Sequence, residues 1–299
     1  MSIPPVFPQY RGQKIPFSIN CRGRLLSLTS PVVMGILNLS PESFYDGGRI
    51  SNRDALLKRA EQLLQGGADI LDIGGASSKP GAEFIEAEIE LERTATAVRH
   101  VRAEFPDTFI SVDTWRSGIA EAAVREGADI INDISGGELD PYIVDIAISN
   151  NTPYVLMHMR GTPKTMQDQP AYSDVTREVI SSIQSRVAAY RQRGLTDIIV
   201  DPGFGFGKSL SDNYRLLADL GRMGQIGCPL LVGVSRKSMI NKVLGTSPEN
   251  ALNGTTALNT IALLNGASIL RVHDAAEARQ CIALVGELRK SKTKDASIG

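Results

Sequence analysis

The chain has 299 residues, of which 42% are hydrophobic and 22% charged, a composition typical of a globular protein that buries a sizeable core. This composition excludes a wholly disordered or fibrous chain. Lys and Arg (32) almost balance Asp and Glu (33), and the formal net charge is −1. A balanced charge gives no general electrostatic reason to bind nucleic acid or a membrane surface.

The ends of the chain predict two short additions to one central domain. Residues 1–30 form a separate N-terminal extension, in which residues 15–28 are typical of a β-hairpin with Arg22-Gly23 at its turn. The last residues, 291–299, are polar and charged and predict a disordered tail. Residues 31–290 are left as a single folded domain.

The N-terminus lacks the apolar segment of a secretory signal, and no run approaches the roughly 18 apolar residues of a membrane span. The three cysteines, Cys21, Cys228 and Cys281, are far apart, odd in number and without a CxxC pair. They therefore indicate neither a disulfide framework nor a zinc site, and they fit a reducing compartment.

From Pro31 onward a short apolar run, a polar residue, a turn and an amphipathic helix repeat along the chain. Eight apolar runs predict strands, at residues 32–38, 68–75, 109–114, 128–135, 153–159, 197–203, 229–235 and 267–274. The helical stretches between them place apolar residues at i, i+3 and i+4. Several predicted helices end at a glycine, as helix C-termini prefer, namely Gly66, Gly127, Gly194 and Gly266.

Near-continuous apolar strands indicate burial on both faces and hence a parallel sheet. Eight strand–helix units in about 250 residues predict an α/β fold of the closed (β/α)8 type, a TIM barrel. A doubly wound open sheet is the alternative. Such a sheet usually carries G-x-G-x-x-G after its first strand, whereas residues 38–44 read NLSPESF.

The carboxyl ends of barrel strands meet at one mouth, where the chemistry of such folds takes place. Every predicted strand here ends in polar residues: Asn38, Asp72, Asp113, Asn132, Asp133, His158, Asp201, Ser235, Arg236, Lys237, Arg271 and His273. Any one of them is compatible with an ordinary turn or helix cap. Together, acceptors on Asp113, Asn132 and Asp201 and donors on Lys237 and Asn132 suit the edge of an amino-pyrimidinone ring.

Arg271 and His273 lie two residues apart on one strand, so their side chains point to the same side. Two basic groups on one face suit an anion such as phosphate. The alternative is an ion pair with a nearby acid such as Asp274. The polar segments 39–49 and 76–84 follow the first two strands and are candidate lids, or else plain surface loops.

Together these segments closely resemble the dihydropteroate synthases. The matching stretches follow one another from residue 34 to residue 274, and the longest are MGILNLSPESFYDGG (34–48), LMHMRGTPKTMQ (156–167) and DPGFGFGK (201–208). The resemblance implies a barrel enzyme that condenses p-aminobenzoate with 6-hydroxymethyl-7,8-dihydropterin pyrophosphate, giving 7,8-dihydropteroate and pyrophosphate. It also implies a cytoplasmic, Mg²⁺-dependent homodimer with small-molecule substrates.

The resemblance also assigns roles to positions of this sequence. Asp113, Asn132, Asp201 and Lys237 match the pterin pocket, with Met157 and Phe206 against the ring faces. Asn38 matches the residue associated with Mg²⁺, and Arg271 and His273 match the pyrophosphate site. The p-aminobenzoate side matches Phe44, Ser78, Pro80 and Ser238. Asn38, Lys237, Arg271 and His273 are the expected catalytic residues.

The second loop departs from the family pattern ESTRPGA. Ala76 replaces a glutamate, and Lys79 replaces an arginine, which keeps the charge but loses the planar fork. A pterin-binding paralogue without catalysis is therefore one alternative. A methyltetrahydrofolate methyltransferase on the same barrel is another. Phe44, the run 235–238 and the run 271–274 favour the synthase, because they match its p-aminobenzoate and pyrophosphate sites.

Overall fold

A computed structural model describes residues 17–39, 50–75, 86–162 and 172–295. Eight parallel strands pair in the order β8-β7-β6-β5-β4-β3-β10-β9, and a parallel bridge between Val200 and Leu230 joins the two outer strands. The barrel is thus closed, as predicted, and the doubly wound alternative is wrong. The strands are β3 (Val32–Asn38), β4 (Ile70–Gly74), β5 (Phe109–Asp113), β6 (Ile130–Asp133), β7 (Tyr154–Met157), β8 (Ile198–Asp201), β9 (Leu231–Val232) and β10 (Ile269–Val272).

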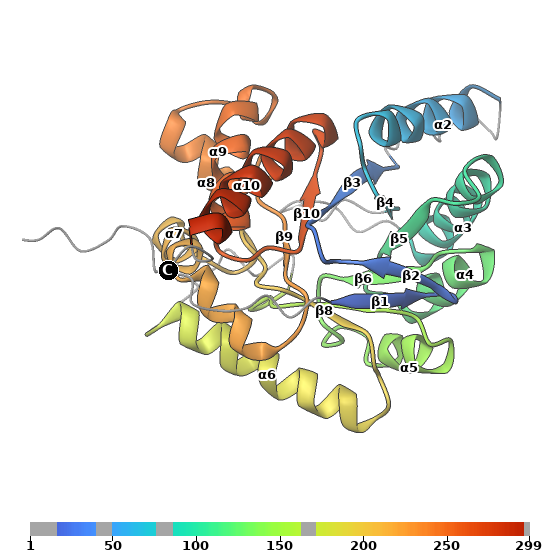
Figure 1. Cartoon of the computed structure of the whole chain (residues 1–299). Helices are drawn as coiled ribbons and strands as arrows, with labels where there is room; N and C mark the ends of the chain where they lie inside the picture. The colour runs from blue at the N-terminus through green and yellow to red at the C-terminus, as the bar shows by residue number, and fades with distance from the viewer. Residues whose placement is uncertain (1–16, 40–49, 76–85, 163–171, 296–299) are drawn as a thin grey trace, which may run out of the picture.

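Helices surround the strands (Figure 1). They are α2 (Ile50–Gln65), α3 (Ala87–Glu104), α4 (Ser117–Glu126), α5 (Tyr142–Ser149), α6 (Val175–Gln192), α7 (Leu210–Ala218), α8 (Ser238–Leu244), α9 (Leu252–Leu264) and α10 (Ala275–Asp295), with 3-10 segments at Leu220–Ile226 and Pro248–Asn250. None of the helices described is long and apolar enough to cross a membrane.

Two details at the helix ends differ from the sequence-based expectation. After α2 the left-handed glycine is Gly67 (φ 89°) rather than Gly66, because the turn is closed by the Gly67 amide donating to the Leu64 carbonyl. At the other end, α10 continues to Asp295 and overlaps the tail predicted from 291. Lys290 pairs with Glu287 at 2.6 Å, and the Ser291 hydroxyl donates to the Leu288 carbonyl. Both contacts join residues three apart on the helix.

Alternation along the strands divides their side chains between two environments. One set points outward and packs under the helices, for example Leu71, Val112 and Ile131. The other set points into the barrel. Its lower layer is apolar and comprises Val32, Met34, Ile70, Ile130, Val155, Ile199, Leu231 and Ile269. The next inward positions toward the carboxyl ends are largely polar, so the mouth has an apolar floor.

An antiparallel hairpin closes the amino end of the barrel. It comprises β1 (Ser18–Cys21) and β2 (Arg24–Ser27), with Arg22 and Gly23 at positive φ in the turn, as the sequence predicts. Its apolar side chains, Ile19, Cys21, Leu26 and Leu28, join the lower interior layer. Figure 1 shows the hairpin lying against this end of the barrel.

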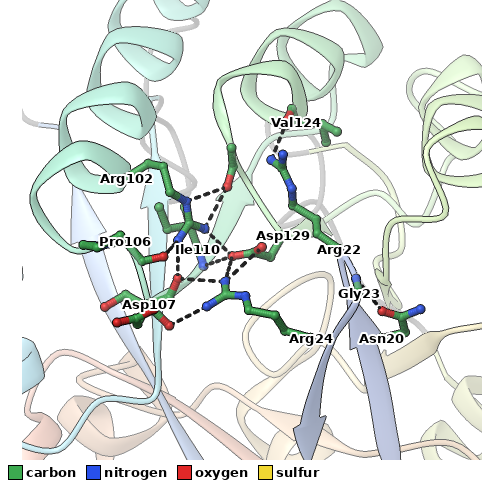
Figure 2. Close-up of polar contacts among 12 residues, drawn as sticks. Asn20, Arg22, Gly23, Arg24, Arg102, Pro106, Asp107, Ile110, Val124 and Asp129 are labelled. Carbon is green, nitrogen blue, oxygen red and sulfur yellow. Dashed lines mark hydrogen bonds and ion pairs between the residues drawn. The ribbon is translucent and has the colours of Figure 1, made fainter.

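Asp129 ties the hairpin to the barrel. Its carboxylate is fully buried and accepts hydrogen bonds from the Arg102 guanidinium (2.5 Å), the Ile110 amide (2.8 Å) and, more loosely, Arg24 (3.3 Å) (Figure 2). Arg24 also donates to the Asp107 carbonyl at 2.6 Å. The buried charge is therefore paired and hydrogen-bonded, as a buried carboxylate must be if it is not to destabilise the fold.

Candidate active site

Five polar side chains occupy the inward positions at the carboxyl half of the barrel: Asp72, Asp113, Asn132, Asp201 and Arg271. Each lies two residues beyond a member of the apolar floor on its own strand, except Asp113, which follows Ser111. All four acidic and amide groups are at least nine-tenths buried. The period of two thus brings these side chains together above the floor.

Arg271 is held between two carboxylates. Its Nε donates to Asp72 Oδ2 at 2.6 Å, and its Nη2 donates to Asp113 Oδ2 at 2.5 Å. Burial opposes a charged guanidinium, but the two carboxylates outweigh burial and raise the pKa of Arg271. Burial raises the pKa of Asp113 to about 7, against the opposing effect of Arg271. Buried groups with shifted pKa values often mark a binding site, and both side chains can form hydrogen bonds to a ligand.

Lys237 follows β9 and lies close enough to Asp201 to feel its charge. Its ammonium donates to the Phe204 carbonyl and sits 4.7 Å from the centre of the Phe206 ring. Burial lowers the pKa of Lys237 to about 8, while Asp201 acts in the opposite direction. Burial likewise raises the pKa of Asp201, whose Oδ1 accepts from the Gly203 amide at 2.7 Å. A carboxylate and an ammonium thus face the same space.

An apolar wall adjoins the polar layer. Ile134, Met157, Met159 and Phe206 form one buried cluster, with Trp115 and Leu139 packed against it. Met157 and Phe206 come from β7 and from the loop after β8, and the structure brings them together. A flat ring whose edge meets Asp113, Asn132 and Asp201 would lay its face on this wall.

Arg271 and His273 have different partners in the structure. Ser235 Oγ lies 3.0 Å from His273 Nδ1, whereas Arg271 turns toward the two acids. Burial, followed by the charge of Arg271, lowers the pKa of His273 to about 4, so its imidazole is neutral at pH 7. The alternative, an ion pair with a nearby acid, holds for Arg271, which pairs with Asp72 and Asp113, whereas Asp274 binds Arg236 at 2.6 Å.

Asn38 and Ser238 mark the open side of the mouth, where both side chains are exposed. A Cβ on Gly74 would lie 3.6 Å from Asn38 Oδ1 and 3.5 Å from the Asp113 Cβ, so the absent side chain leaves space between the two residues. Within the described ranges, three or more His, Cys, Asp or Glu side chains nowhere gather as metal ligands. Phe44, Ser78 and Pro80, like Ala76 and Lys79, lie outside the described residues.

Two buried groups are absent from the set of predicted site residues. Asp72 is fully buried in the middle of β4, and a charge inside an apolar run is the sequence signal that a cation lies opposite. Lys208 is 5% exposed and its Nζ donates to the carbonyls of Gly203 (2.9 Å) and Phe206 (3.1 Å). The lysine therefore holds the glycine-rich loop that carries Phe206, a role that the run GFGFGK only hints at.

Comparisons with known proteins identify the family of this chain. Residues 34–273 match the model of the pterin binding enzymes. The dihydropteroate synthase of Escherichia coli (strain K12) is 42% identical over 88% of this chain and 94% of its own, and that of a Synechocystis strain is 43% identical over 81% and 84%.

Solved structures agree with the sequence matches. A Yersinia pestis dihydropteroate synthase with a sulfonamide superposes with a TM-score of 0.85 at 38% identity, covering 92% of this chain and all of the other. A Xanthomonas albilineans dihydropteroate synthase gives 0.84 at 38% identity, covering 91% and 98%. The chain therefore belongs to the pterin-binding enzyme family and, within it, to the dihydropteroate synthases.

Proposed function

We propose that the polar layer and the apolar wall together bind 6-hydroxymethyl-7,8-dihydropterin pyrophosphate for condensation with p-aminobenzoate. The products are 7,8-dihydropteroate and pyrophosphate. The observation that carries the proposal is the buried set Asp113, Asn132 and Asp201 beside Lys237, together with the apolar wall that contains Met157 and Phe206. Solved relatives from Xanthomonas albilineans contain 4-aminobenzoic acid and 7,8-dihydropteroate, which supports this choice of ligands.

The pterin edge offers N–H donors beside a carbonyl and a ring nitrogen. We assign its donors to Asp113 and Asp201, and its acceptors to Asn132 and Lys237. The ring then lies against Met157 and Phe206. Because these polar groups are buried, a ligand that lacks any of the matching atoms leaves one of them unpaired, and this is the source of selectivity.

The pyrophosphate half extends toward Arg271 and His273. Arg271 supplies positive charge and a planar donor fork. His273, being neutral at pH 7, contributes a ring hydrogen bond rather than a second charge. As the bond between the methylene carbon and pyrophosphate breaks, the electron pair leaves with the phosphate oxygen, and these donors stabilise the developing charge.

Asn38 fits the Mg²⁺ expected for this family. Mg²⁺ prefers hard oxygen ligands and usually keeps waters and phosphate oxygens around one or two protein ligands. The Asn38 amide oxygen is such a ligand, and the side chain is exposed at the mouth, where waters and phosphate oxygens would complete the coordination shell. When bound there with pyrophosphate, the ion would neutralise part of the leaving group's charge.

The second substrate attacks the methylene carbon through the lone pair of its aromatic amine, forming the C–N bond and then releasing a proton. This amine is unprotonated at neutral pH, so the step requires no strong general base. We assign the amine's approach to the side of Ser238, Phe44, Ser78 and Pro80. The first of these is exposed at the start of α8, and the other three remain predictions.

We also propose that the enzyme is a cytoplasmic homodimer. The family resemblance supports both statements. The free, buried cysteines at positions 21, 228 and 281 fit the reducing cytoplasm. Exposed apolar side chains on α10, with Leu284 at 74% and Leu288 at 45%, support association with a second copy. Sedimentation velocity would give twice the chain mass if the dimer forms, and the chain mass if it does not.

The function is tested by mixing the purified protein with dihydropterin pyrophosphate, radiolabelled p-aminobenzoate and Mg²⁺ and following labelled dihydropteroate. We expect product, and we expect EDTA to abolish it. As a control, the Asp133→Asn variant should also form product. This change removes a buried carboxylate that binds Tyr154 and faces away from the mouth. A folded wild-type protein that binds pterin but forms no product would contradict the proposal and favour a non-catalytic paralogue.

A further inference from the structure

Asp72 contacts one residue from each half of the assigned substrate site. Its Oδ2 accepts from Arg271 Nε at 2.6 Å and from Asn132 Nδ2 at 3.1 Å. The side chain is fully buried in the centre of β4. Its other oxygen, Oδ1, is also buried and has no hydrogen-bond partner within the described part of the chain. A buried carboxylate in this state keeps its position only while its cation stays in place.

Arg271 shares its charge between two carboxylates of different character. Asp72 accepts a hydrogen bond from Nε and is fully buried, whereas Asp113 accepts one from Nη2 and is 8% exposed. Two carboxylates around one guanidinium leave a local excess of negative charge, which opposes the entry of pyrophosphate. A pterin whose N–H groups bind Asp113 replaces Arg271 as its donor, and Nη2 becomes available to phosphate oxygens.

We propose that Asp72 is a positioning residue that couples pterin binding to pyrophosphate binding through Arg271. Asp72 holds the guanidinium by Nε, so that Nη2 exchanges between Asp113 and the phosphate while the arginine stays in the mouth. Occupying the pterin half then tightens pyrophosphate binding, and by linkage pyrophosphate tightens pterin binding equally. The inference rests on the proposed function, because it uses the assignment of Asp113 to the pterin and Arg271 to the anion.

Titration calorimetry measures the coupling directly. The probe is inorganic pyrophosphate at fixed Mg²⁺, with and without saturating 6-hydroxymethylpterin, a ligand that carries no phosphate. We expect the pterin to lower the Kd of pyrophosphate about tenfold in the wild-type protein, within the usual range of site–site coupling. In Asp72→Asn, which keeps the shape but removes the charge, we expect the ratio of the two Kd values to fall below about threefold.

Asp133→Asn is the matched control. Asp133 is equally buried at the end of β6, two strands from Asp72, but it accepts from Ser135, Gly137 and Tyr154. Its replacement should lower the melting temperature and keep the coupling. If Asp72→Asn fails to fold, Arg271→Lys gives a second test, because a lysine retains the charge but lacks the planar fork whose Nε and Nη2 reach the two carboxylates from separate atoms.

The outcomes separate this inference from the function on which it rests. Loss of coupling in Asp72→Asn or Arg271→Lys, with coupling intact in Asp133→Asn, supports the inference. Binding of both ligands to the wild-type protein without coupling, or full coupling in Asp72→Asn, overturns it and leaves the function standing. Binding of neither ligand to the wild-type protein overturns the site assignment and this inference together.

Discussion

The two ends of the barrel treat buried carboxylates in opposite ways. At the amino end, Asp129 accepts from two arginines and one backbone amide and closes the barrel beneath the hairpin. At the carboxyl end, one buried oxygen of Asp72 finds no partner among the described residues, and burial raises the pKa values of Asp113 and Asp201. The first arrangement stabilises the fold, whereas the second stores unsatisfied hydrogen-bonding capacity that a ligand can use.

This contrast follows from where each end obtains its hydrogen bonds. The amino end is sealed by segments of the chain itself, so every polar group needs a partner from the protein. The carboxyl end must stay open to substrates, so its groups take partners from the ligand, at a cost in stability. Substitutions at the carboxyl end should therefore change activity, and substitutions at the amino end should change the free energy of unfolding.

The largest effect is expected at the mouth, from Asp201→Asn. The amide keeps the bond from the Gly203 amide but loses the charge and places a donor against the pterin N–H groups. We expect kcat/KM for the pterin substrate to fall about a thousandfold, about 4 kcal/mol. The free energy of unfolding should change by less than about 1 kcal/mol, because burial opposes the charge of Asp201 and raises its pKa, so relief of this cost offsets the lost attraction to Lys237. Steady-state kinetics and urea unfolding check the two halves, and an unfolded variant would contradict the second.

The reverse pattern is expected at the amino end, from Asp129→Asn. Removing this charge leaves the Arg102 and Arg24 side chains without their carboxylate. We expect the free energy of unfolding to fall by about 3 kcal/mol. The folded variant should retain kcat/KM within about twofold at 20 °C, well below the tenfold that corresponds to 1.4 kcal/mol. A large loss of activity in fully folded protein would show that the hairpin end takes part in function.

The pH dependence of kcat/KM should report the mouth alone. Asp113 binds the pterin N–H groups when ionised, and its pKa is raised to about 7 by burial. Lys237 donates when protonated, and its pKa is lowered to about 8, again by burial. The rate should therefore fall about tenfold per unit below pH 7 and above pH 8. Asp113→Asn should abolish the acid limb; persistence of that limb would assign it to the substrate or another group.

The smallest effect is expected from Lys79→Arg in the second loop. This change restores the fork that the family pattern carries at that position. We expect the KM for p-aminobenzoate or kcat to change by no more than about tenfold, about 1.4 kcal/mol. Initial rates at saturating pterin substrate check it. A larger change would mean that the lysine performs a task that an arginine cannot.

The sequence predicts the barrel well and the site unevenly, for a physical reason. Apolar runs identify the strands because both faces of the parallel sheet are buried, so all eight runs became strands. The side chains that end those strands were also identified, but not their partners. The spacing of Arg271 and His273 predicts a shared side, whereas tertiary contacts turn Arg271 to Asp72 and leave His273 neutral. Such pairings span about 200 residues of sequence, beyond any local pattern.

The first structure to determine is a crystal structure with 6-hydroxymethylpterin and pyrophosphate. We expect the pterin edge on Asp113, Asn132 and Asp201, with Arg271 Nη2 turned from Asp113 to a phosphate oxygen. The amino end also offers a cavity of about 410 Å³, lined by Arg22, Glu121, Val124, Arg125, Asn150 and Thr152. Ligands found in that cavity, with the mouth empty and Arg271 still on Asp113, would contradict the account.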